Sequence, residues 1–583
     1  MRFGFAFLIG GLCATSVALA APAPNAEAGK DPADQTETEV GIPVASALVR
    51  EKCGSCHTPD DKGDLSRISW VRATPEGWAQ TLKRMVKLNG LSITPDEARS
   101  VVRYLSTYQG LAPDEAKPVM YLAEHRDPDE TIIPNETLRQ TCASCHAFAQ
   151  PMSSRRSHRE WALLENMHKA LYSTAQAIYD APSGGAQEGS ALARGAGDED
   201  KKSPPRWQVA LDWLSANAPL HTAEWAAWRP GIHAPHLGGK WLVSAVLPGH
   251  GRFVGEMVIA PGPGGADEFT TTTTLRSIDG GEQVVRKGVG LVYAGYSWRG
   301  TSQGGTKPVR PDDMPATMRE TMWFAPDQAT AMGRWYWGEY HEFGFDVTMT
   351  RETGGAALVA ASEQGLRIGT NGVRLRLFGA NLPTDLKAAD IDLGAGVTVR
   401  QVVSATPDEA VIVVDVAGDA IPGPRDIAMR GAVLRKGISV YAHVDYIKVA
   451  PETALARLGG IKFGKGYQQF TAIGWSNGAD GKPGTQDDFA VGTVPATWSL
   501  AEFATVSYDD DISFVGTLDP KTGLFTPNVE GPDPKRRFSR NNYGDVWVVA
   551  TAKDDRGKAL TGRAFLVTTV PAYKRWDQPE VSR

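Results

Sequence analysis

Cysteine is scarce in this chain, with five in 583 residues. Cys13 lies in the N-terminal apolar segment, and the other four form two pentapeptides, CGSCH at 53–57 and CASCH at 142–146. No cysteine therefore remains for a disulfide, a separate metal site or a thiol nucleophile. We expect core burial, and not cross-links, to stabilise the fold.

Several other features are absent. The formal net charge is -6, and the sequence shows no cluster of basic residues that would form a basic face. Both features argue against nucleic acid as a partner. No apolar run after residue 20 is long enough to span a membrane. The chain has no phosphate loop and no HExxH helix. Its mean hydropathy of -0.27 is typical of a globular protein, and its length predicts about four domains.

The N-terminus has the pattern of a secretory signal. Arg2 precedes an apolar run over 3–20 that ends in Ala18-Leu19-Ala20, a small-x-small cleavage site. Residues 1–20 are therefore predicted to be a signal peptide, and the mature protein to be exported, most simply to a bacterial periplasm. Residues 21–45 are rich in Ala, Pro, Asp and Glu without periodicity and predict a flexible leader.

Each pentapeptide has the form of a c-type haem site. Two cysteines at this spacing can form thioether bonds to one haem, and the following histidine ligates its iron. A zinc knuckle would need a second ligand pair, and a thioredoxin-like motif would not need the histidine. We predict two covalently bound haems, with these binding residues: Cys53, Cys56 and His57; Cys142, Cys145 and His146.

The surroundings of the two motifs repeat. Residues 138–141 precede the second motif as 49–52 precede the first, and the segment 210–215 resembles 101–106. We infer an all-α tandem dihaem cytochrome c domain over 46–220. Its haem units are 46–125 and 131–220, and a flexible surface insertion is predicted at 173–205.

The repeat also predicts the distal iron ligands. Met85 follows Trp78, and His168 follows Trp161, by the same two helical turns, so each lies on the same helix face as its tryptophan. The predicted metal ligands are His57 with Met85 and His146 with His168.

Other residues compete for these distal positions. Met85 has the alternative role of a core methionine, and His168 that of a surface or core histidine. The reserves for the first haem are Met120 and His125, and those for the second are His158 and Met167. Thioether ligation raises a haem's reduction potential relative to two imidazoles, so electrons are expected to enter at the second haem and leave from the first.

After residue 221 the pattern becomes all-β. Short β-branched and aromatic runs punctuated by Gly and Pro predict an aromatic-rich β-barrel, or a sandwich, over 221–353. Similar runs predict an immunoglobulin-like β-sandwich at 354–452 and a second one at 453–583. The fold class is thus multidomain, with a helical dihaem region followed by three all-β units.

Two minor candidate sites remain. The segment 477–488 has the glycines and oxygen ligands of a calcium loop but lacks the spacing and final Glu of an EF-hand, which favours a surface loop. His233 and His236 flank Pro235 in a predicted loop, where solvated side chains are the stronger interpretation.

The order of these features resembles the α (dihaem) subunit of quinohemoprotein amine dehydrogenase over the full length. The dihaem region carries the specific part of the resemblance. It implies a heterotrimer with a β-propeller chain and a small chain bearing cysteine tryptophylquinone, which oxidises primary amines. It also implies a soluble cytochrome c or blue-copper acceptor. Since this chain has no spare cysteine for that quinone, we predict no catalytic residue in it and place amine oxidation on another chain.

Two other functions stay open at this point. One is a stand-alone dihaem cytochrome whose β-domains bind a partner or surface. The other is a dihaem peroxidase, which also has two CxxCH motifs but needs an open iron site and no long β-region.

Overall fold

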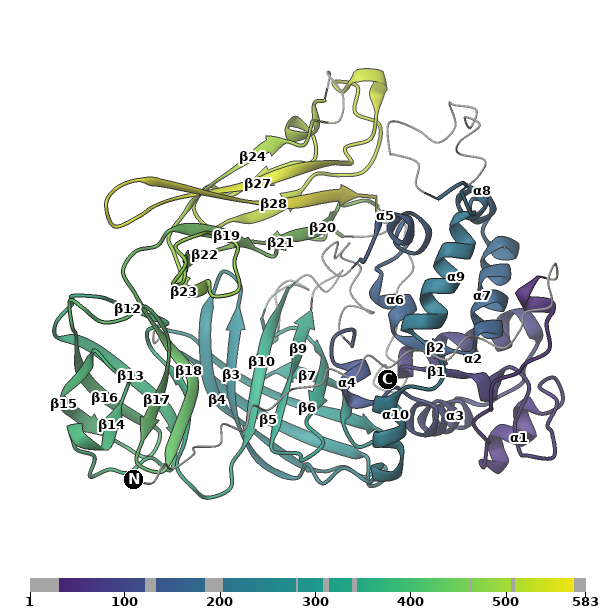
Figure 1. Cartoon of the computed structure of the whole chain (residues 1–583), viewed down its shortest axis with the longest axis horizontal. Helices are drawn as coiled ribbons and strands as arrows, with labels where there is room; N and C mark the ends of the chain where they lie inside the picture. The colour runs from purple at the N-terminus through teal and green to yellow at the C-terminus, as the bar shows by residue number, and fades with distance from the viewer. Residues whose placement is uncertain are drawn as a thin grey trace, which may run out of the picture.

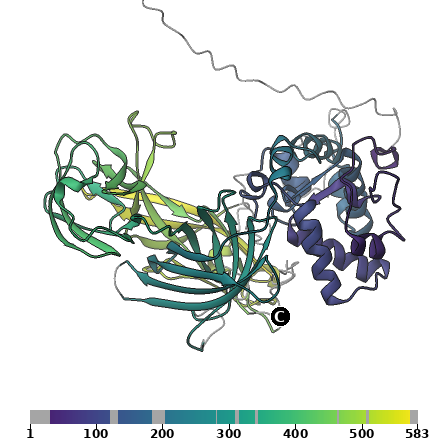
Figure 2. The same cartoon turned by 90° about the horizontal axis from the view of Figure 1, so that it is seen from below.

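The computed structural model describes residues 31–120, 133–183, 203–278, 281–307, 314–337, 343–461, 464–504 and 509–570. The predicted signal peptide with Cys13, and the reserve ligand His125, lie outside these ranges. A helical region stands on one side of the molecule, and a barrel and two β-sandwich units occupy the other (Figures 1 and 2). The predicted fold class is confirmed.

The helical region is built from two similar halves. In each, a short strand leads into a long helix, and a further helix packs behind it. The helices are α1 (Ala47–Cys53), α2 (Pro75–Asn89), α3 (Pro95–Tyr108), α4 (Pro113–Ala116), α5 (Glu136–Leu138), α6 (Ala149–Met152), α7 (His158–Leu171), α8 (Ala175–Asp180), α9 (Arg206–Asn217) and α10 (Ala223–Trp228).

The two halves meet through one antiparallel strand pair. Strand β1 (Val71–Ala73) runs into α2, and β2 (Ser154–Arg156) runs into α7. Arg72 lies opposite Arg155 at the centre of the pair. Because Arg72 and Arg155 also stand at the same distance before Trp78 and Trp161, the halves are related by a local two-fold axis through this pair.

The hydrogen bonds around the strand pair obey the same symmetry. Thr74 N donates to Ser153 O (3.1 Å), and Ser157 N donates to Trp70 O (3.2 Å). Thr74 and Ser157 are also the N-caps of α2 and α7, where each side chain accepts a backbone N–H. The same local chemistry therefore starts both long helices.

The leader differs from the flexible segment that its composition predicts, as far as it is described. Residues 35–39 lie against the second half, where Ser157 Oγ donates to Glu37 Oε2 (2.6 Å) and Arg159 Nε donates to Gln35 O (2.6 Å). Residues 42–45 lie against the first half, where Ile42 N donates to Ser69 O (2.8 Å). His158 N donates to Glu39 Oε1 (2.8 Å), so the leader carboxylates meet the N-terminus of α7. Composition did not reveal these pairings because their partners lie more than a hundred residues away.

The segment predicted as a surface insertion contains structure at its start. Residues 175–180 form α8, which packs beside α7 and α9 (Figure 1). Residues 184–202 lie outside the described part of the chain.

The barrel is closed by eight antiparallel strands in the order β10-β3-β4-β5-β6-β7-β8-β9. Its interior is filled by large side chains, among them Trp241, Trp298 and Trp335. The strands are β3 (Gly239–Leu247), β4 (Gly251–Pro261), β5 (Glu268–Ser277), β6 (Gln283–Tyr293), β7 (Ser297–Gly304), β8 (Met318–Phe324), β9 (Thr330–Trp337) and β10 (Phe343–Arg351).

The barrel is fastened to the first helical half by a buried ion pair. Arg299 on β7 donates through Nε (2.5 Å) and Nη2 (3.1 Å) to the two carboxylate oxygens of Glu76 on α2, and both side chains are about 1% exposed. Tyr296 adds a hydrogen bond from its hydroxyl to Leu111 O (2.7 Å). The barrel therefore supports α2, the helix that carries Met85.

The third unit is a two-sheet sandwich, with strand orders β11-β13-β16-β15 and β12-β18-β17-β14 around one apolar core. The strands are β11 (Ala357–Ala361), β12 (Gly365–Arg367), β13 (Val373–Ala380), β14 (Ile391–Asp392), β15 (Val397–Ala405), β16 (Glu409–Val416), β17 (Gly423–Met429) and β18 (Ala432–Tyr441).

The C-terminal unit begins earlier than the sequence indicated. Strand β19 (Tyr446–Ala450), expected in the third unit, pairs with β22 of the fourth. The remaining strands are β20 (Thr453–Arg457), β21 (Gln468–Gln469), β22 (Thr471–Ser476), β23 (Phe489–Thr493), β24 (Thr497–Glu502), β25 (Gly516–Leu518), β26 (Leu524–Pro527), β27 (Gly544–Lys553) and β28 (Ala559–Thr569). Among the described residues, no helix is long and apolar enough to cross a membrane.

Candidate haem centres

The first motif follows a short capped helix. Ser46 caps α1 by accepting Val49 N, and the helix ends at Cys53. The backbone N–H of Cys56 and that of His57 both bond to Cys53 O, which folds the motif into a tight turn. Cys53 is half-buried and Cys56 exposed, and neither is in a disulfide. Both thiols are therefore available for thioether bonds.

The second motif begins on a different local structure. Residues Arg139–Ala143 form a π-helical turn directly after α5, and Cys142 belongs to it. Burial, aided by the nearby charge of Glu165, raises the pKa of the Cys142 thiol to about 12. Burial likewise raises the pKa of Cys53.

Three of the predicted iron ligands share one hydrogen-bond pattern. The Nδ1 of His57 donates to Ser66 O (2.8 Å), that of His146 to Ala147 O (3.1 Å) and that of His168 to Leu164 O (2.8 Å). A carbonyl oxygen only accepts, so each ring carries its proton on Nδ1 and its lone pair on Nε2. This is the tautomer that binds a metal through Nε2, with the carbonyl orienting the ring.

The distal candidates lie on the two long helices. Trp78 on α2 is buried and donates from Nε1 to Gln109 O (3.0 Å), just past the end of α3. Trp161 on α7 is buried and donates to Ala218 O (3.0 Å), just past the end of α9. Each tryptophan is therefore held by the next long helix of its own half.

Met85 and His168 stand at equivalent positions on these helices. Each lies two turns beyond its tryptophan, in the part of the helix where burial decreases. Met85 is half-buried and accepts a weak hydrogen bond from Asn89 Nδ2 (3.7 Å) at Sδ. His168 is half-buried between the rings of Tyr172 and Tyr179, at centroid distances of 5.8 and 6.2 Å.

The reserve ligands are placed differently. Met120 is buried against the barrel, where Ser297 Oγ contacts its Sδ (3.9 Å). His158 is the first residue of α7, at the opposite end from His168, and Met167 adjoins His168 on the same helix. Met120 therefore has the role of a packing residue between the barrel and the helical region.

Sequence reasoning missed a charged cluster between the two halves. Arg72 and Arg155, the central residues of the β1–β2 pair, both contact the carboxylate of Glu115. The equal spacing of each arginine from its tryptophan was visible in the sequence, but the shared carboxylate depends on the fold. The rings of Tyr172 and Tyr179 beside His168 were missed too.

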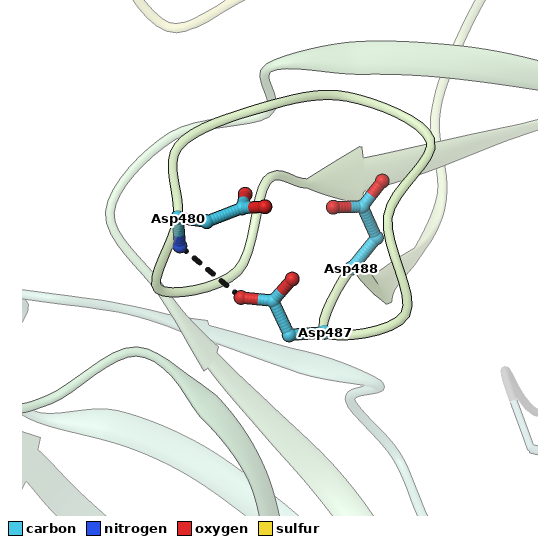
Figure 3. A group of neighbouring side chains, drawn as sticks. All are labelled: Asp480, Asp487 and Asp488. Carbon is cyan, nitrogen blue, oxygen red and sulfur yellow. Dashed lines mark hydrogen bonds between the residues drawn. The ribbon is translucent and has the colours of Figure 1, made fainter.

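The acidic loop at 477–488 was the other predicted candidate. The ligand atoms of Asp480, Asp487 and Asp488 lie within 4.8 Å of one another (Figure 3). These carboxylates also brace the loop: Asp487 Oδ2 accepts Asp480 N (3.2 Å), and Asp488 Oδ2 accepts the hydroxyl of Tyr446 (2.6 Å). The arrangement accounts for a stable surface turn between β22 and β23.

The residues present fit two haems of the c type. The cysteine pairs are not cross-linked, and the adjacent histidines are in the metal-binding tautomer. On α2, Val86 and Leu88 beside Met85 are exposed, as are Leu171 and Tyr172 beyond His168 on the chain. Apolar side chains near both distal positions suit the surface that a haem would cover.

Comparison with protein families gives four consecutive matches. All four family models describe the quinohemoprotein amine dehydrogenase α subunit. The haem-binding model matches residues 44–182, domain II matches 234–352, domain III matches 355–442 and domain IV matches 447–581. The last boundary agrees with the pairing of β19.

Similarity to solved structures is partial. A de novo designed fluorescence-activating β-barrel is 17% identical, with coverage of 21% of this chain and 98% of that chain and a TM-score of 0.16. SGBP-B from the Bacteroides ovatus mixed-linkage glucan utilization locus is 10% identical, with coverage of 57% and 60% and a TM-score of 0.16. At these TM-scores the similarities carry no weight. No curated protein matches the chain.

Proposed function

The chain belongs to the quinohemoprotein amine dehydrogenase α-subunit family, and we propose that it is the dihaem electron-transfer subunit of a periplasmic enzyme of this kind. In this proposal it carries electrons from a cysteine tryptophylquinone on a separate small subunit to a soluble cytochrome c or blue-copper protein. The electrons come from oxidative deamination of a primary amine by the complex, which also contains a β-propeller subunit.

One observation supports this proposal most strongly. Two CxxCH motifs are combined with two long helices that present Met85 and His168 at symmetry-equivalent positions. An electron-transfer unit needs two cofactors held rigidly and close together, and the shared β1–β2 pair joins the two halves directly. The barrel ion pair between Arg299 and Glu76 adds support to the first half.

The residues of the chain have distinct roles in this proposal. Cys53 and Cys56, and likewise Cys142 and Cys145, attach one haem each. The His57 and His146 rings ligate iron from one side, with Nδ1 held by a backbone carbonyl. A bound haem supplies reversible one-electron transfer at iron. A thioether from Met85 would raise the potential of a haem held at the first site, and an imidazole from His168 would keep that of the second lower, so the two side chains would set the direction of transfer.

Amine oxidation is assigned to another chain. After the predicted signal segment, all four cysteines belong to the two haem motifs, so none is available to crosslink to a tryptophan. We therefore assign no catalytic base to this subunit. The proposed partners follow from this division: a small quinone-bearing subunit, a β-propeller subunit and a soluble acceptor.

The test is reduction of the haems by substrate in the purified native complex. Addition of a primary amine should produce the absorption bands of ferrous haem, whereas the isolated haem-loaded chain should respond to dithionite and not to amine. Mass spectrometry of the complex should show three different chains. A single-chain protein whose haems are not reduced by amines, and which catalyses the reduction of peroxide, would refute the proposal in favour of a dihaem peroxidase.

A further inference from the structure

A buried charge cluster lies on the local two-fold axis between the two halves. Arg72 donates to both carboxylate oxygens of Glu115, from Nη1 (2.7 Å) and Nη2 (3.1 Å), and Arg155 Nε lies 3.2 Å from Glu115 Oε1. Arg72 is 0% exposed, and Glu115 and Arg155 are 7% exposed each. Two guanidinium groups thus share one carboxylate.

The surrounding polar groups hold this cluster in place without neutralising it. Arg72 also donates to Leu220 O (2.7 Å) and Gly110 O (3.2 Å), and Arg155 donates to Met152 O (2.7 Å) and Ser154 O (2.9 Å). Glu115 accepts Thr222 Oγ1 (2.8 Å) and Ala112 N (2.7 Å). These hydrogen-bond partners are uncharged. They therefore orient Arg72, Arg155 and Glu115 without changing the net charge of the three side chains.

The carboxylate remains ionised. Burial by itself would raise the pKa of Glu115, but the hydrogen bonds and charge of Arg72 and the charge of Arg155 outweigh it and hold the pKa below its usual value. Arg299 and Glu76, which lie nearby, neutralise each other. The cluster therefore holds one positive charge in excess, away from water.

A departure from the internal symmetry explains this excess. Gln109 O accepts the Trp78 N–H, and Ala218 O accepts the Trp161 N–H. Glu115 comes as many residues after Gln109 as Glu224 comes after Ala218, but Glu115 is buried on α4 and Glu224 is exposed on α10. Glu224 therefore acts on Arg155 only from the surface, where water screens its charge, and Glu115 is the one carboxylate of this pair that is buried among the arginines.

The position of the cluster relates it equally to both centres. Arg72 lies on β1, which leads directly into α2 and Met85, and Arg155 lies on β2, which leads directly into α7 and His168. The local two-fold axis through the β1–β2 pair relates each group of one half to an equivalent group of the other half. A charge on this axis therefore lies at similar distances from the two equivalent groups. A buried positive charge favours the haem state with one more electron, because that state is more negative.

We propose that the Arg72–Glu115–Arg155 cluster is a shared electrostatic element that raises the reduction potentials of both haems together. It rests on the proposed function, since it requires two haems in this chain. The axial ligands make the two potentials unequal. The cluster shifts both potentials in the same direction and by similar amounts, so the difference between them is preserved. The reduction potentials of both haems then stay between that of the electron donor and that of the electron acceptor.

The test is a spectroelectrochemical titration of the haem-loaded complex with two opposite substitutions. Glu115→Gln removes the negative charge while keeping the shape, and both midpoint potentials should rise. Arg155→Met removes one positive charge and leaves the Arg72–Glu115 pair neutral, so both potentials should fall. Arg435→Gln, which alters an exposed ion pair with Asp426 in the third unit, is the matched control and should shift neither potential.

Several outcomes would overturn the inference: a shift of one haem only, shifts of the same sign in both variants, or no shift in correctly loaded protein. If neither buried variant assembles, Glu224→Gln decides. It removes an exposed negative charge near Arg155 and should raise both potentials slightly at low ionic strength, and their constancy would refute the proposal. Fewer than two haem waves in the unaltered complex would instead refute the proposed function.

Discussion

The two halves of the helical region have the same framework but different surroundings. Each starts its long helix from one strand of the β1–β2 pair and holds a tryptophan against the end of the next helix. The first half is then joined to the barrel by the Arg299–Glu76 ion pair, whereas α7 of the second half is contacted at its N-terminus by the leader carboxylates. The two halves thus share the same arrangement of strand, helix and tryptophan, and they differ in the segments that pack against them.

The proposed distal ligands differ in the same way. A methionine and a histidine occupy the same position on equivalent helices, so the difference in chemistry comes from one side chain and not from a different backbone. If both side chains ligate iron as proposed, a duplicated framework gives two haems of different potential with few substitutions. The following experiments test how far the two halves are equivalent.

The largest expected effect comes from removing one haem at a time. Cys142→Ala with Cys145→Ala should lose one haem and abolish reduction of the remaining haem by amine, because electrons are proposed to enter at the second site. Cys53→Ala with Cys56→Ala should keep that reduction but abolish transfer to the acceptor. Haem content follows from the pyridine haemochrome spectrum, and transfer from stopped-flow absorbance. The reverse pattern would invert the proposed direction.

Exchanging the distal ligand tests the chemical difference alone. Met85→His should remove the sulfur-to-iron absorption band and lower the potential of the first haem by on the order of 0.1 V, within the range of about 0.8 V that axial ligands set. Redox titration of the complex measures the shift. His168→Met is the matched change in the other half and should raise the potential of the second haem. Survival of the band in Met85→His would exclude Met85 as the ligand.

Breaking the clamp between the barrel and α2 tests the structural difference. Arg299→Met removes the guanidinium that pairs with the buried carboxylate of Glu76, which should cost about 3–5 kcal/mol of unfolding free energy. Urea unfolding followed by Soret circular dichroism measures it. Arg435→Met removes an exposed ion pair and should cost less than about 1 kcal/mol. Similar losses in both variants would show that the clamp does not stabilise the haem region.

The smallest effect tests the shared framework. Trp78→Phe and Trp161→Phe each delete one N–H donor, while the two accepting carbonyls keep a second partner, the N–H of Ala73 and that of Arg156. Each change should therefore cost about 1 kcal/mol for the lost hydrogen bond and a similar amount for the space that the smaller ring leaves in the core, and the two costs should be similar. Parallel urea titrations measure the two losses of unfolding free energy. Clearly different losses would mean that α2 and α7 are not held in equivalent ways.

Much of this organisation could be predicted from local patterns. The CxxCH motifs, the equal spacing of Trp78–Met85 and Trp161–His168, and the alternation of the β-runs are all short-range signals, and they indicated the helical region, the barrel and the sandwiches. The strand at 446–450 was placed in the wrong unit because nothing in its own composition reveals that it pairs with β22 and not with the strands before it.

Long-range pairings could not be predicted in the same way. The leader has the composition of an unstructured segment, and its partners on α7 become visible only in the folded chain. Glu115 resembles an ordinary helix-start carboxylate after Pro113, and Ala112 N does donate to it. Its second role, between two arginines from different halves, depends on tertiary contacts that no local spacing encodes.

The leader contact has a consequence for the order of folding. Gln35 and Glu37 precede both CxxCH motifs in the chain, yet their partners Arg159 and Ser157 follow more than a hundred residues later. Closing so long a loop costs entropy before any contact repays it, so this attachment forms after the helices it joins. Residues 35–39, which are synthesised before either half, thus reach their final position late, when α7 has already formed.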